Sequence, residues 1–210
     1  MPSTPHDAKG LFIASVEDDN PVVFFEHRWL HNPHGPVPEG HYTVALGESR
    51  IVTEGSDVTI VAASYATIEA IKAARELARE GINAEIIDLR TLVPRNDAAI
   101  LASVRKTGRL VVVDQGTLTG GFAGEIVARV TEQAFPALKA APIRVTLPDI
   151  PTPTTRALSN YYYPTPRHIA AAARRTLGLP CKEAQDDPWA GIEPADKTLD
   201  VPDKSFSGPF

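Results

Sequence analysis

Four histidines close together are the first residues whose types could do chemistry in this chain of 210 residues. His27, His31, His34 and His41 could gather around a metal ion, because imidazole is a common metal ligand. The stretch shows no cysteine or carboxylate spacing of a metal motif, and metal-ligating histidines normally come from rigid elements. We interpret these histidines as solvent-facing or interface residues and keep a metal centre as the alternative.

Two side chains are candidates for a nucleophile. Ser64 follows an apolar run and precedes a helical pattern, which is where α/β hydrolases place their serine. Its neighbours are Ala62, Ala63, Tyr65 and Ala66, so the glycines of the hydrolase motif are missing, and we expect Ser64 to be a helix N-cap.

The cysteine is a weaker candidate. Cys181 is the single cysteine of the chain and lies beside Lys182, with no histidine near it in the sequence. A catalytic thiol needs a base or a positive environment to form the thiolate, so the sequence argues against that role.

A glycine-rich loop spans residues 116–122, between a predicted strand and a predicted helix. Backbone N–H groups at a helix N-terminus can bind an anion. The loop lacks the Lys-Ser/Thr ending of a P-loop and does not match the dinucleotide-binding glycine pattern. We therefore expect a tight strand-to-helix turn, with an anion site as the alternative.

Composition excludes several classes of function. The net charge of −5 argues against a nucleic-acid surface, which needs concentrated Lys and Arg. The longest apolar runs are too short to cross a bilayer, so no membrane partner is expected. One cysteine and no basic-apolar leader make the cytoplasm the expected location.

The N-terminal elements come next. Asp7 is expected to be the N-cap of a helix over residues 8–16, which ends before the polar turn at residues 18–21. Val22 to Phe25 is an apolar run of strand length and is expected to form a buried strand. Residues 27–48 contain three prolines and several glycines and predict a linker.

Beyond the linker, strands and helices alternate. The predicted strands are 57–63, 84–89, 109–114 and 143–146, and the predicted helices are 65–80, 97–106, 122–135 and 167–177. Gly81 and Gly108 are expected to stop the first two helices. Nearly all-apolar strands that alternate with helices predict a doubly wound α/β fold with a mostly parallel sheet.

The last segment, residues 179–210, differs in composition. It holds five prolines, three lysines and seven acidic residues, so it carries −4 of the total charge of −5. Such a segment cannot bury enough surface to fold alone. We expect an acidic, proline-rich extended arm whose scattered apolar side chains lie along another surface, with a disordered tail as the alternative.

Several motifs in order resemble one family. Residues 2–11, with Pro-Ser-Thr-Pro and Asp-Ala-Lys-Gly-Leu, and residues 18–27, Asp-Asp-Asn-Pro-Val-Val-Phe-Phe-Glu-His, resemble β subunits of 2-oxo acid dehydrogenase complexes, in their thiamine diphosphate-dependent decarboxylating component. Residues 54–61, 87–94, 106–113 and 119–122 look like that family's transketolase C-terminal domain. The resemblance covers about residues 2–178.

The resemblance implies a domain organisation. Residues 1–26 would be the last helix and strand of a truncated pyrimidine-binding domain, 27–48 the linker, 49–178 the transketolase C-terminal-like domain and 179–210 the arm. The family's catalytic glutamate and histidine lie upstream of the Pro-Ser-Thr-Pro segment. No catalytic or cofactor-binding residue is therefore carried over to this chain.

One family site does carry over. In the family, the turn after the first helix often binds potassium through carbonyl and side-chain oxygens. The matching positions are Ser15, Val16, Asp18 and Asn20, and oxygen ligands suit a hard cation. A polar turn without a metal is the alternative interpretation.

The resemblance also implies cofactors and partners. Thiamine diphosphate would be bound by the complex, with magnesium at the α subunit. The partners would be that α subunit, a second β chain, the missing pyrimidine-binding half and a lipoyl acyltransferase. The chain itself would contribute assembly, and the 2-oxo acid (pyruvate, branched-chain or acetoin type) is not selected by the sequence.

Other interpretations remain open. A non-catalytic interaction module with the same fold is one, and a subunit of another transketolase-like enzyme is a second. Since the first helix and strand would lack their sheet, we expect Leu11, Val23 and Phe25 to expose apolar surface and the chain to associate with another chain.

Overall fold

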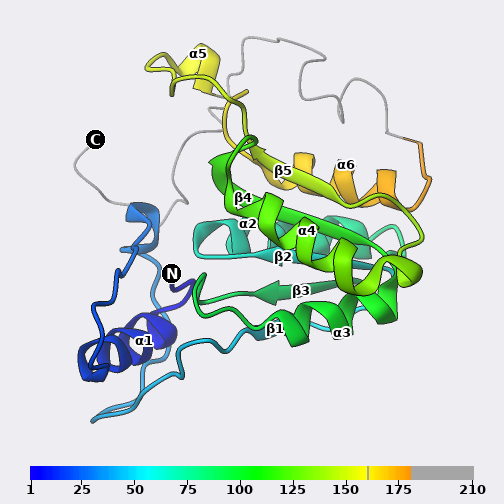
Figure 1. The fold of residues 1–210 in the computed structure, drawn as a ribbon. Helices are drawn as coiled ribbons and strands as arrows, with labels where there is room; N and C mark the ends of the chain where they lie inside the picture. Colours follow the sequence, from blue (N-terminus) through cyan, green and yellow to red (C-terminus); the bar gives the residue numbers. More distant parts are fainter. Residues whose placement is uncertain (160, 181–210) are drawn as a thin grey trace.

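The computed structural model describes residues 1–159 and 161–180, and it places a five-stranded sheet at the centre of the chain. The strand order is β1-β3-β2-β4-β5, with helices on both faces and the N-terminal helix α1 beyond one end of the sheet (Figure 1). The arm at residues 181–210, with Cys181, lies outside the described residues.

Four strands are mutually parallel, as the sequence predicts: β2 (Val58–Ala62), β3 (Ala84–Asp88), β4 (Leu110–Thr117) and β5 (Ile143–Leu147). β2 and β3 are buried along their whole length, because helices cover both faces of this part of the sheet. The doubly wound α/β expectation is confirmed.

One strand was not predicted. β1 (Arg50–Thr53) pairs antiparallel with β3 at the edge of the sheet. Its four residues alternate between partly buried and exposed positions, and the run is too short to give a clear periodic pattern. Only the exposed edge of β3 explains why this segment is extended.

The helices divide into two layers. α2 (Tyr65–Ala78) and α6 (Pro166–Thr176) pack together on one face, while α3 (Asp97–Thr107) and α4 (Phe122–Ala134) cover the other. The short helices are η1 (Arg28–Leu30), η2 (Phe135–Ala137) and α5 (Arg156–Ser159).

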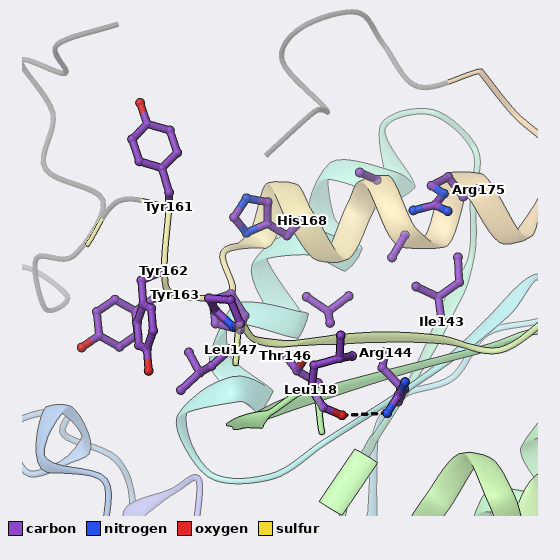
Figure 2. A pocket seen from close by; sticks show the side chains of 15 residues that line it. Leu118, Ile143, Arg144, Thr146, Leu147, Tyr161, Tyr162, Tyr163, His168 and Arg175 are labelled. Carbon is purple, nitrogen blue, oxygen red and sulfur yellow. Dashed lines mark hydrogen bonds between the residues drawn. The ribbon is translucent and has the colours of Figure 1, made fainter. Parts of the chain in front are cut away.

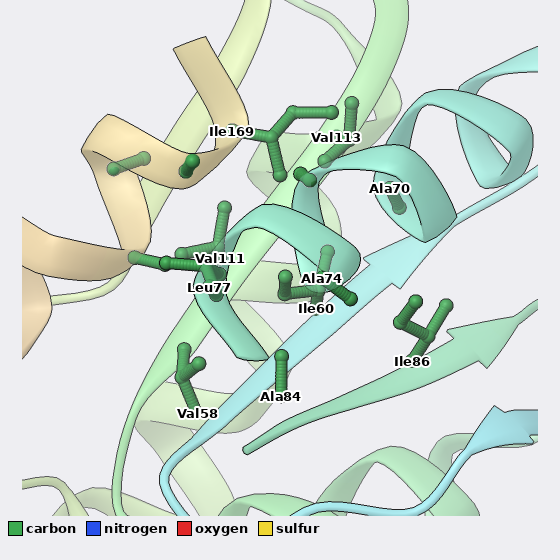
Figure 3. Close-up of a cluster of buried hydrophobic side chains, with 14 of the residues drawn as sticks. Val58, Ile60, Ala70, Ala74, Leu77, Ala84, Ile86, Val111, Val113 and Ile169 are labelled. Atoms are coloured by element: carbon green, nitrogen blue, oxygen red, sulfur yellow. The ribbon is translucent and has the colours of Figure 1, made fainter. Parts of the chain in front are cut away.

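Each face of the sheet has its own apolar core. Figure 3 shows the first, in which Leu77 of α2 and Ile169 of α6 meet Ile60 and Val111 from the sheet, all four fully buried. The second core contains Ile100 of α3, Ile126 of α4 and the opposite side of the strands. The sheet domain is therefore closed by its own helices.

One of the two helices expected to stop at a glycine does so, and the other ends before its glycine. Gly108 is the left-handed C-cap of α3, with φ of 74°, and its N–H bonds the carbonyl of Val104. α2 ends at Ala78, with Arg79 as its cap, two residues before the predicted end at residue 80. Gly81 follows with φ of 78°.

The start of the first helix differs from the prediction. α1 (Pro5–Glu17) begins three residues earlier than expected, and Thr4 is its N-cap, accepting a hydrogen bond from the N–H of Asp7. The expectation that Asp7 caps the helix is wrong. Pro5 is compatible with the first helical turn, where no N–H is needed, and the Asp7 carboxylate instead points into a buried ion network.

The predicted strand at residues 22–25 is also not found. These residues have no regular structure, and Val23 and Phe25 are 75% and 56% exposed. A strand needs a neighbour to satisfy its N–H and C=O groups, and no described segment pairs with this one. Residues 22–25 are apolar, but the described residues contain no sheet edge with which they pair.

Leu11 behaves differently from Val23 and Phe25. It is 1% exposed, so the expectation that it exposes apolar surface is wrong. Residues 42–44 cover α1 next to it: the N–H of Val44 bonds the carbonyl of Gly10, and a Cβ at Gly10 would lie 2.5 Å from the Val44 side chain. The predicted linker supplies this cover.

Within the described residues, no helix has the length and apolar character needed to span a membrane.

Candidate functional site

The carboxyl edge of the parallel strands carries a hollow where α/β folds usually bind ligands. The loops after β2 and β4 leave the sheet in opposite directions, and between them lies a cavity of about 240 Å³. Its lining is mainly apolar and includes Ala63, Val113 and Phe122 from the sheet domain, with Met1 and Phe25 from the N-terminal segment. The cavity thus joins the two parts of the chain.

Asp114, the acidic residue that lines this cavity, stabilises the loop before α4. One oxygen of Asp114 accepts a hydrogen bond from the N–H of Gly116 at 2.8 Å, and the other accepts from Ala123 in the first turn of α4 at 2.9 Å. A carboxylate therefore occupies the place at the helix N-terminus where an anion would bind. A Cβ at Gly121 would lie 2.0 Å from the carbonyl oxygen of Thr117, so the loop needs a glycine to make its turn.

Ser64 lies where the sequence places it, directly before α2, but its side chain does not cap the helix. Its φ of 54° and ψ of −132° differ from the extended backbone of an ordinary N-cap. The hydroxyl is fully buried and has no hydrogen-bond partner among the described residues. Ser64 is thus the N-cap residue of α2, as expected, but its side chain makes no capping hydrogen bond. Among the described residues, no histidine hydrogen-bonds Ser64 to activate it as a nucleophile.

The four histidines do not converge on a metal. His27 stacks on Tyr65 with ring centroids 4.8 Å apart, His31 lies 3.5 Å from Glu26, and His41 lies 2.6 Å from Glu17. In residues 1–159 and 161–180, no three His, Cys, Asp or Glu side chains are grouped as metal ligands.

His27 is held as a neutral ring. Burial lowers its pKa, with a further contribution from the charge of His31. Its Nδ1 accepts a hydrogen bond from the N–H of Trp29 at 3.2 Å, so Nε2 carries the proton of the neutral ring. Together with His31 it lines a hollow of about 560 Å³ between α1 and residues 26–37.

A buried ion network connects α1 to the end of β3. Arg90 donates a hydrogen bond to Asp7 at 2.8 Å, and Asp88 accepts from Ser3 and Thr67 and lies 3.7 Å from Arg50. Both carboxylates are fully buried. We call Asp7, Asp88, Arg50 and Arg90 the ionic latch.

Burial acts differently on the two acids of the ionic latch. Burial raises the pKa of Asp88 and outweighs the hydrogen bonds from Ser3 and from the backbone of Arg90. Burial also acts to raise the pKa of Asp7, but hydrogen bonds from His6 and Arg90, with the charges of Arg90 and Arg50, bring it below its usual value. Asp7 therefore depends on His6 and on Arg90 to stay ionised inside the protein.

Sequence reasoning missed the ionic latch. The available signal was an aspartate and an arginine, Asp88 and Arg90, at the end of an otherwise apolar strand, where a buried charge requires a partner. Asp7, the partner of Arg90, lies 83 residues earlier in the sequence, so only the fold identifies it.

The four predicted potassium ligands share one exposed turn at the end of α1. The Ser15 hydroxyl donates to the carbonyl of Leu11 at 2.7 Å. One oxygen of Asp18 accepts from both the backbone and the side-chain N–H groups of Asn20, which lowers the pKa of Asp18. Since α1 ends at Glu17, the carbonyls of Ser15 and Val16 belong to the last turn, which lacks helical donors.

Within the described residues, these groups form no catalytic constellation. Asp114 caps a helix, Ser64 is buried without a base, and the ionic latch binds one part of the chain to another. The arrangement can hold segments in place, and the exposed turn after α1 gathers several oxygen atoms.

The strand order and the layers of helices define a doubly wound α/β domain of transketolase C-terminal type. The chain belongs to the family "Transketolase, C-terminal domain", whose sequence pattern matches residues 47–169.

Curated relatives are β subunits of dehydrogenases. The chain is 48% identical over 176 residues to the acetoin:2,6-dichlorophenolindophenol oxidoreductase β subunit of Cupriavidus necator, covering 84% of this chain and 52% of the relative. It is 40% identical to the pyruvate dehydrogenase E1 component β subunit of Bacillus subtilis, covering 84% and 54%. It is 40% identical to the mitochondrial 2-oxoisovalerate dehydrogenase subunit beta 2 of Arabidopsis thaliana, covering 84% and 49%.

The chain thus spans about half the length of these relatives. Among solved structures, a split gene transketolase described as an inactive β4 tetramer matches with a TM-score of 0.58 and 30% identity. That match covers 65% of this chain and 44% of the other.

Proposed function

We propose that this chain is the C-terminal part of the β subunit of a 2-oxo acid dehydrogenase, where it contributes subunit assembly. The observation that carries the proposal is 40–48% identity to acetoin, pyruvate and 2-oxoisovalerate dehydrogenase β subunits over 84% of the chain. The chain spans about half of each relative, and the described residues form no catalytic constellation, so the proposed contribution is to assembly.

The exposed surface of the N-terminal segment supports an assembly role. Phe12, Val16, Val23 and Phe25 are each more than half exposed, and all lie in residues 12–25. A gathered apolar surface of this kind is typical of an interface. A pyrimidine-binding domain, the α subunit and a second β chain are the partners proposed to cover it.

The cofactors are assigned to the assembled complex. Thiamine diphosphate, when bound by the complex, supplies the carbanion chemistry of decarboxylation before acyl transfer to a lipoyl group on the acyltransferase. Magnesium would accompany it at the α subunit. The residues of this chain hold neighbouring segments in position, and we propose the cytoplasm as the location.

Potassium is the one ion proposed to bind this chain. The end of α1 carries the negative end of the helix dipole, has no basic residue in its last turn and is followed by Asp18 and Asp19. The carbonyls of Ser15 and Val16 in the last turn of α1 and the carboxylate of Asp18 are oxygen ligands of the kind hard cations take. These residues therefore fit the ion.

Thermal unfolding in potassium chloride and in sodium chloride of equal ionic strength tests the ion. We expect a higher midpoint in potassium, since binding to the folded state alone stabilises it. Asp18→Asn should abolish the difference, whereas Asp19→Asn, one position away, should retain it. Equal midpoints in both salts for the unmutated chain would rule out a potassium site.

The functional proposal is tested by affinity purification of the tagged full chain from its native extract, with mass spectrometry of the co-purifying chains. We expect a thiamine-binding α subunit and a chain that carries the pyrimidine-binding half, and we expect the recovered complex to oxidise a 2-oxo acid or acetoin with an artificial acceptor. Phe12→Asp with Val23→Asp should abolish recovery. Phe135→Asp, at a side chain that is 66% exposed elsewhere, is the matched control.

A split transketolase is the second candidate, favoured by the match to the split gene transketolase. Its 30% identity is lower than that to the dehydrogenase β subunits. Transfer of two-carbon units between sugar phosphates by the recovered complex would favour this candidate. Recovery of neither partner chain would instead favour the non-catalytic interaction module.

A further inference from the structure

Buried side-chain atoms that lack a protein partner gather in the ionic latch. Among the described residues, four buried side-chain nitrogen or oxygen atoms have no hydrogen bond, and three of them belong to the latch: Asp7 Oδ2, Arg50 Nε and Arg90 Nε. A buried polar atom without a hydrogen bond costs about 1–3 kcal/mol, so native proteins rarely leave one unpaired. Three such atoms in one ion network point to a ligand that the network holds.

Both described partners of Asp7 use the same carboxylate oxygen. Oδ1 lies 3.1 Å from Nδ1 of His6 and accepts a hydrogen bond from Nη2 of Arg90 at 2.8 Å. Oδ2 has no partner in the part of the chain that the structure describes. The Asp7 side chain is fully buried, so Oδ2 does not reach bulk solvent. Half of this carboxylate therefore remains to be bound.

Arg90 shows the same asymmetry from its side of the pair. In a guanidinium group, Nε–H and one N–H of Nη2 lie on the same edge, so a carboxylate can accept from both at once. Arg90 donates to Asp7 through Nη2, while its buried Nε–H has no partner among the described residues. The Arg90–Asp7 pair is thus a fork with one closed limb and one limb that is open at both ends.

Other arginines of the chain do find protein partners. Arg174 forms a closed fork with Glu80, donating through Nε at 3.1 Å and through Nη2 at 2.8 Å. Beside the hollow at β5, Arg144 donates to the carbonyl of Leu118 at 2.8 Å (Figure 2). The open limb is therefore a feature of the ionic latch and not of arginines throughout this fold.

The second arginine of the latch also has an open Nε–H. Nη2 of Arg50 lies 3.7 Å from Asp88, beyond hydrogen-bond distance, and Nε of Arg50 is buried without a described partner. The charge of Arg50 also contributes to the lowered pKa of Asp7, so it acts on the same carboxylate as Arg90. The latch thus presents two N–H donors and one carboxylate oxygen to a ligand.

Water is the ligand that complements these three atoms. Its oxygen can accept from two N–H groups while one of its hydrogens is donated to a carboxylate, and buried waters typically make about three hydrogen bonds. A cation would be repelled by the two guanidinium groups, and an anion would be repelled by the Asp7 carboxylate. A small neutral molecule that both donates and accepts meets neither repulsion.

We propose that the ionic latch binds a buried water molecule, which accepts from Nε of Arg90 and Nε of Arg50 and donates to Oδ2 of Asp7. The water completes the open fork and joins α1, which carries Asp7, to β1 and to the end of β3. A water-bridged contact accommodates small shifts of α1, whereas a closed fork fixes both of its groups. The proposal is independent of the dehydrogenase assignment, because it concerns only groups of this chain.

A crystal structure of the full chain, at a resolution that shows ordered water, tests the proposal directly. We expect a density peak within about 2.7–3.2 Å of Asp7 Oδ2, Arg90 Nε and Arg50 Nε. The closed fork of Arg174 and Glu80 is the internal control and should contain no such peak. A direct hydrogen bond from Arg90 Nε to Asp7 Oδ2, or no density between these atoms, would overturn the proposal.

Nuclear magnetic resonance of the unmutated chain with ¹⁵N-labelled arginine tests the same water in solution. The Nε–H of Arg90 should show a rotating-frame Overhauser cross peak to water, opposite in sign to a proton-exchange peak, whereas the Nε–H of Arg174 should show none. Arg90→Lys removes this Nε–H and so assigns the signal. Absence of the cross peak at Arg90 would overturn the proposal.

The hydroxyl of Ser3, which donates to Asp88 in the latch, provides the control for an indirect signal. A hydroxyl proton that exchanges with solvent could relay magnetisation from Arg90 to water. Ser3→Ala removes this hydroxyl and should leave the Arg90 cross peak unchanged. Loss of the cross peak in Ser3→Ala would assign it to the hydroxyl and would contradict a bound water.

Discussion

The sheet domain and the N-terminal segment are built from similar apolar residues but bury them to different extents. Ile60 and Ile86 in the sheet are fully buried, whereas Val23 and Phe25 in the N-terminal segment are more than half exposed. The sheet has helices of its own chain on both faces, whereas residues 18–27 join no strand among the described residues. The difference shows that the sheet domain buries its apolar residues with its own helices, whereas the N-terminal segment leaves part of its apolar surface exposed.

The ionic latch is where these two regions meet, and breaking it should have the largest effect. Arg90→Met would leave the Asp7 carboxylate buried without its partner, and we expect a loss of about 3–5 kcal/mol in the docking of α1. Amide exchange in α1 should rise while exchange in β2 and β3 stays slow. Arg105→Met, at an exposed arginine of α3, is the control. Slow exchange in α1 of the Arg90 variant would show that the latch does not hold the two regions together.

A pair of matched truncations compares the two regions directly. Ile60→Ala removes a fully buried side chain from the first core and should lower the free energy of unfolding by about 2–5 kcal/mol. Val23→Ala should change it by less than about 0.5 kcal/mol, because the side chain is exposed in the isolated chain. Denaturant unfolding measures both. A large loss from Val23→Ala would mean that the N-terminal segment is packed within this chain after all.

Strain at Ser64 can be relieved within the sheet domain. Ser64→Gly removes a side chain held at positive φ and a buried hydroxyl without a described partner. We expect stabilisation by about 1 kcal/mol, which is a rise of about 2–4 °C in the unfolding midpoint of a domain this size. Ser56→Gly, at a loop position of ordinary φ, is the control. A lower midpoint for Ser64→Gly would indicate that the hydroxyl has a partner that stabilises it.

Acidification should act on His168 at the start of α6. Burial lowers its pKa from the ordinary value of 6.5, so the unfolded chain binds the proton more readily than the folded chain. This contribution to stability is therefore present above pH 6.5 and is lost as the pH falls through the lower pKa of the folded state. We expect a small decrease in the free energy of unfolding over that window.

The matching substitution is His168→Gln, which retains the capping interaction with Thr165 but removes the titrating ring. The decrease on acidification should become smaller in this variant. Equal pH profiles for both proteins would assign the effect to other groups, such as His27.

The sheet was predictable for a physical reason. Strands buried on both faces must be nearly all apolar, and runs such as residues 110–113 carry that signal without any reference to their neighbours. The end of α3 at Gly108 was predictable from the local sequence as well, because a left-handed helix cap favours glycine whatever the surroundings.

Pairings between distant residues were not predictable in the same way. β1 is a strand because β3 has a free edge beside it, and residues 22–25 are not a strand because no free edge reaches them. The Asp7 carboxylate suits a helix N-cap as well as a buried ion pair, and only the position of Arg90 decides between the two roles. The positive φ of Ser64 was likewise not predictable from the sequence, since serine normally avoids positive φ.

The sequence by itself determined the four parallel strands with the helices that cover them, and the membership of the transketolase C-terminal domain family, because periodic burial and motif spacing are properties of neighbouring residues. Only the tertiary structure decided which segments pair, which charges are buried together and which apolar surface remains exposed. Those outcomes depend on groups that are far apart in the chain and meet only when it folds.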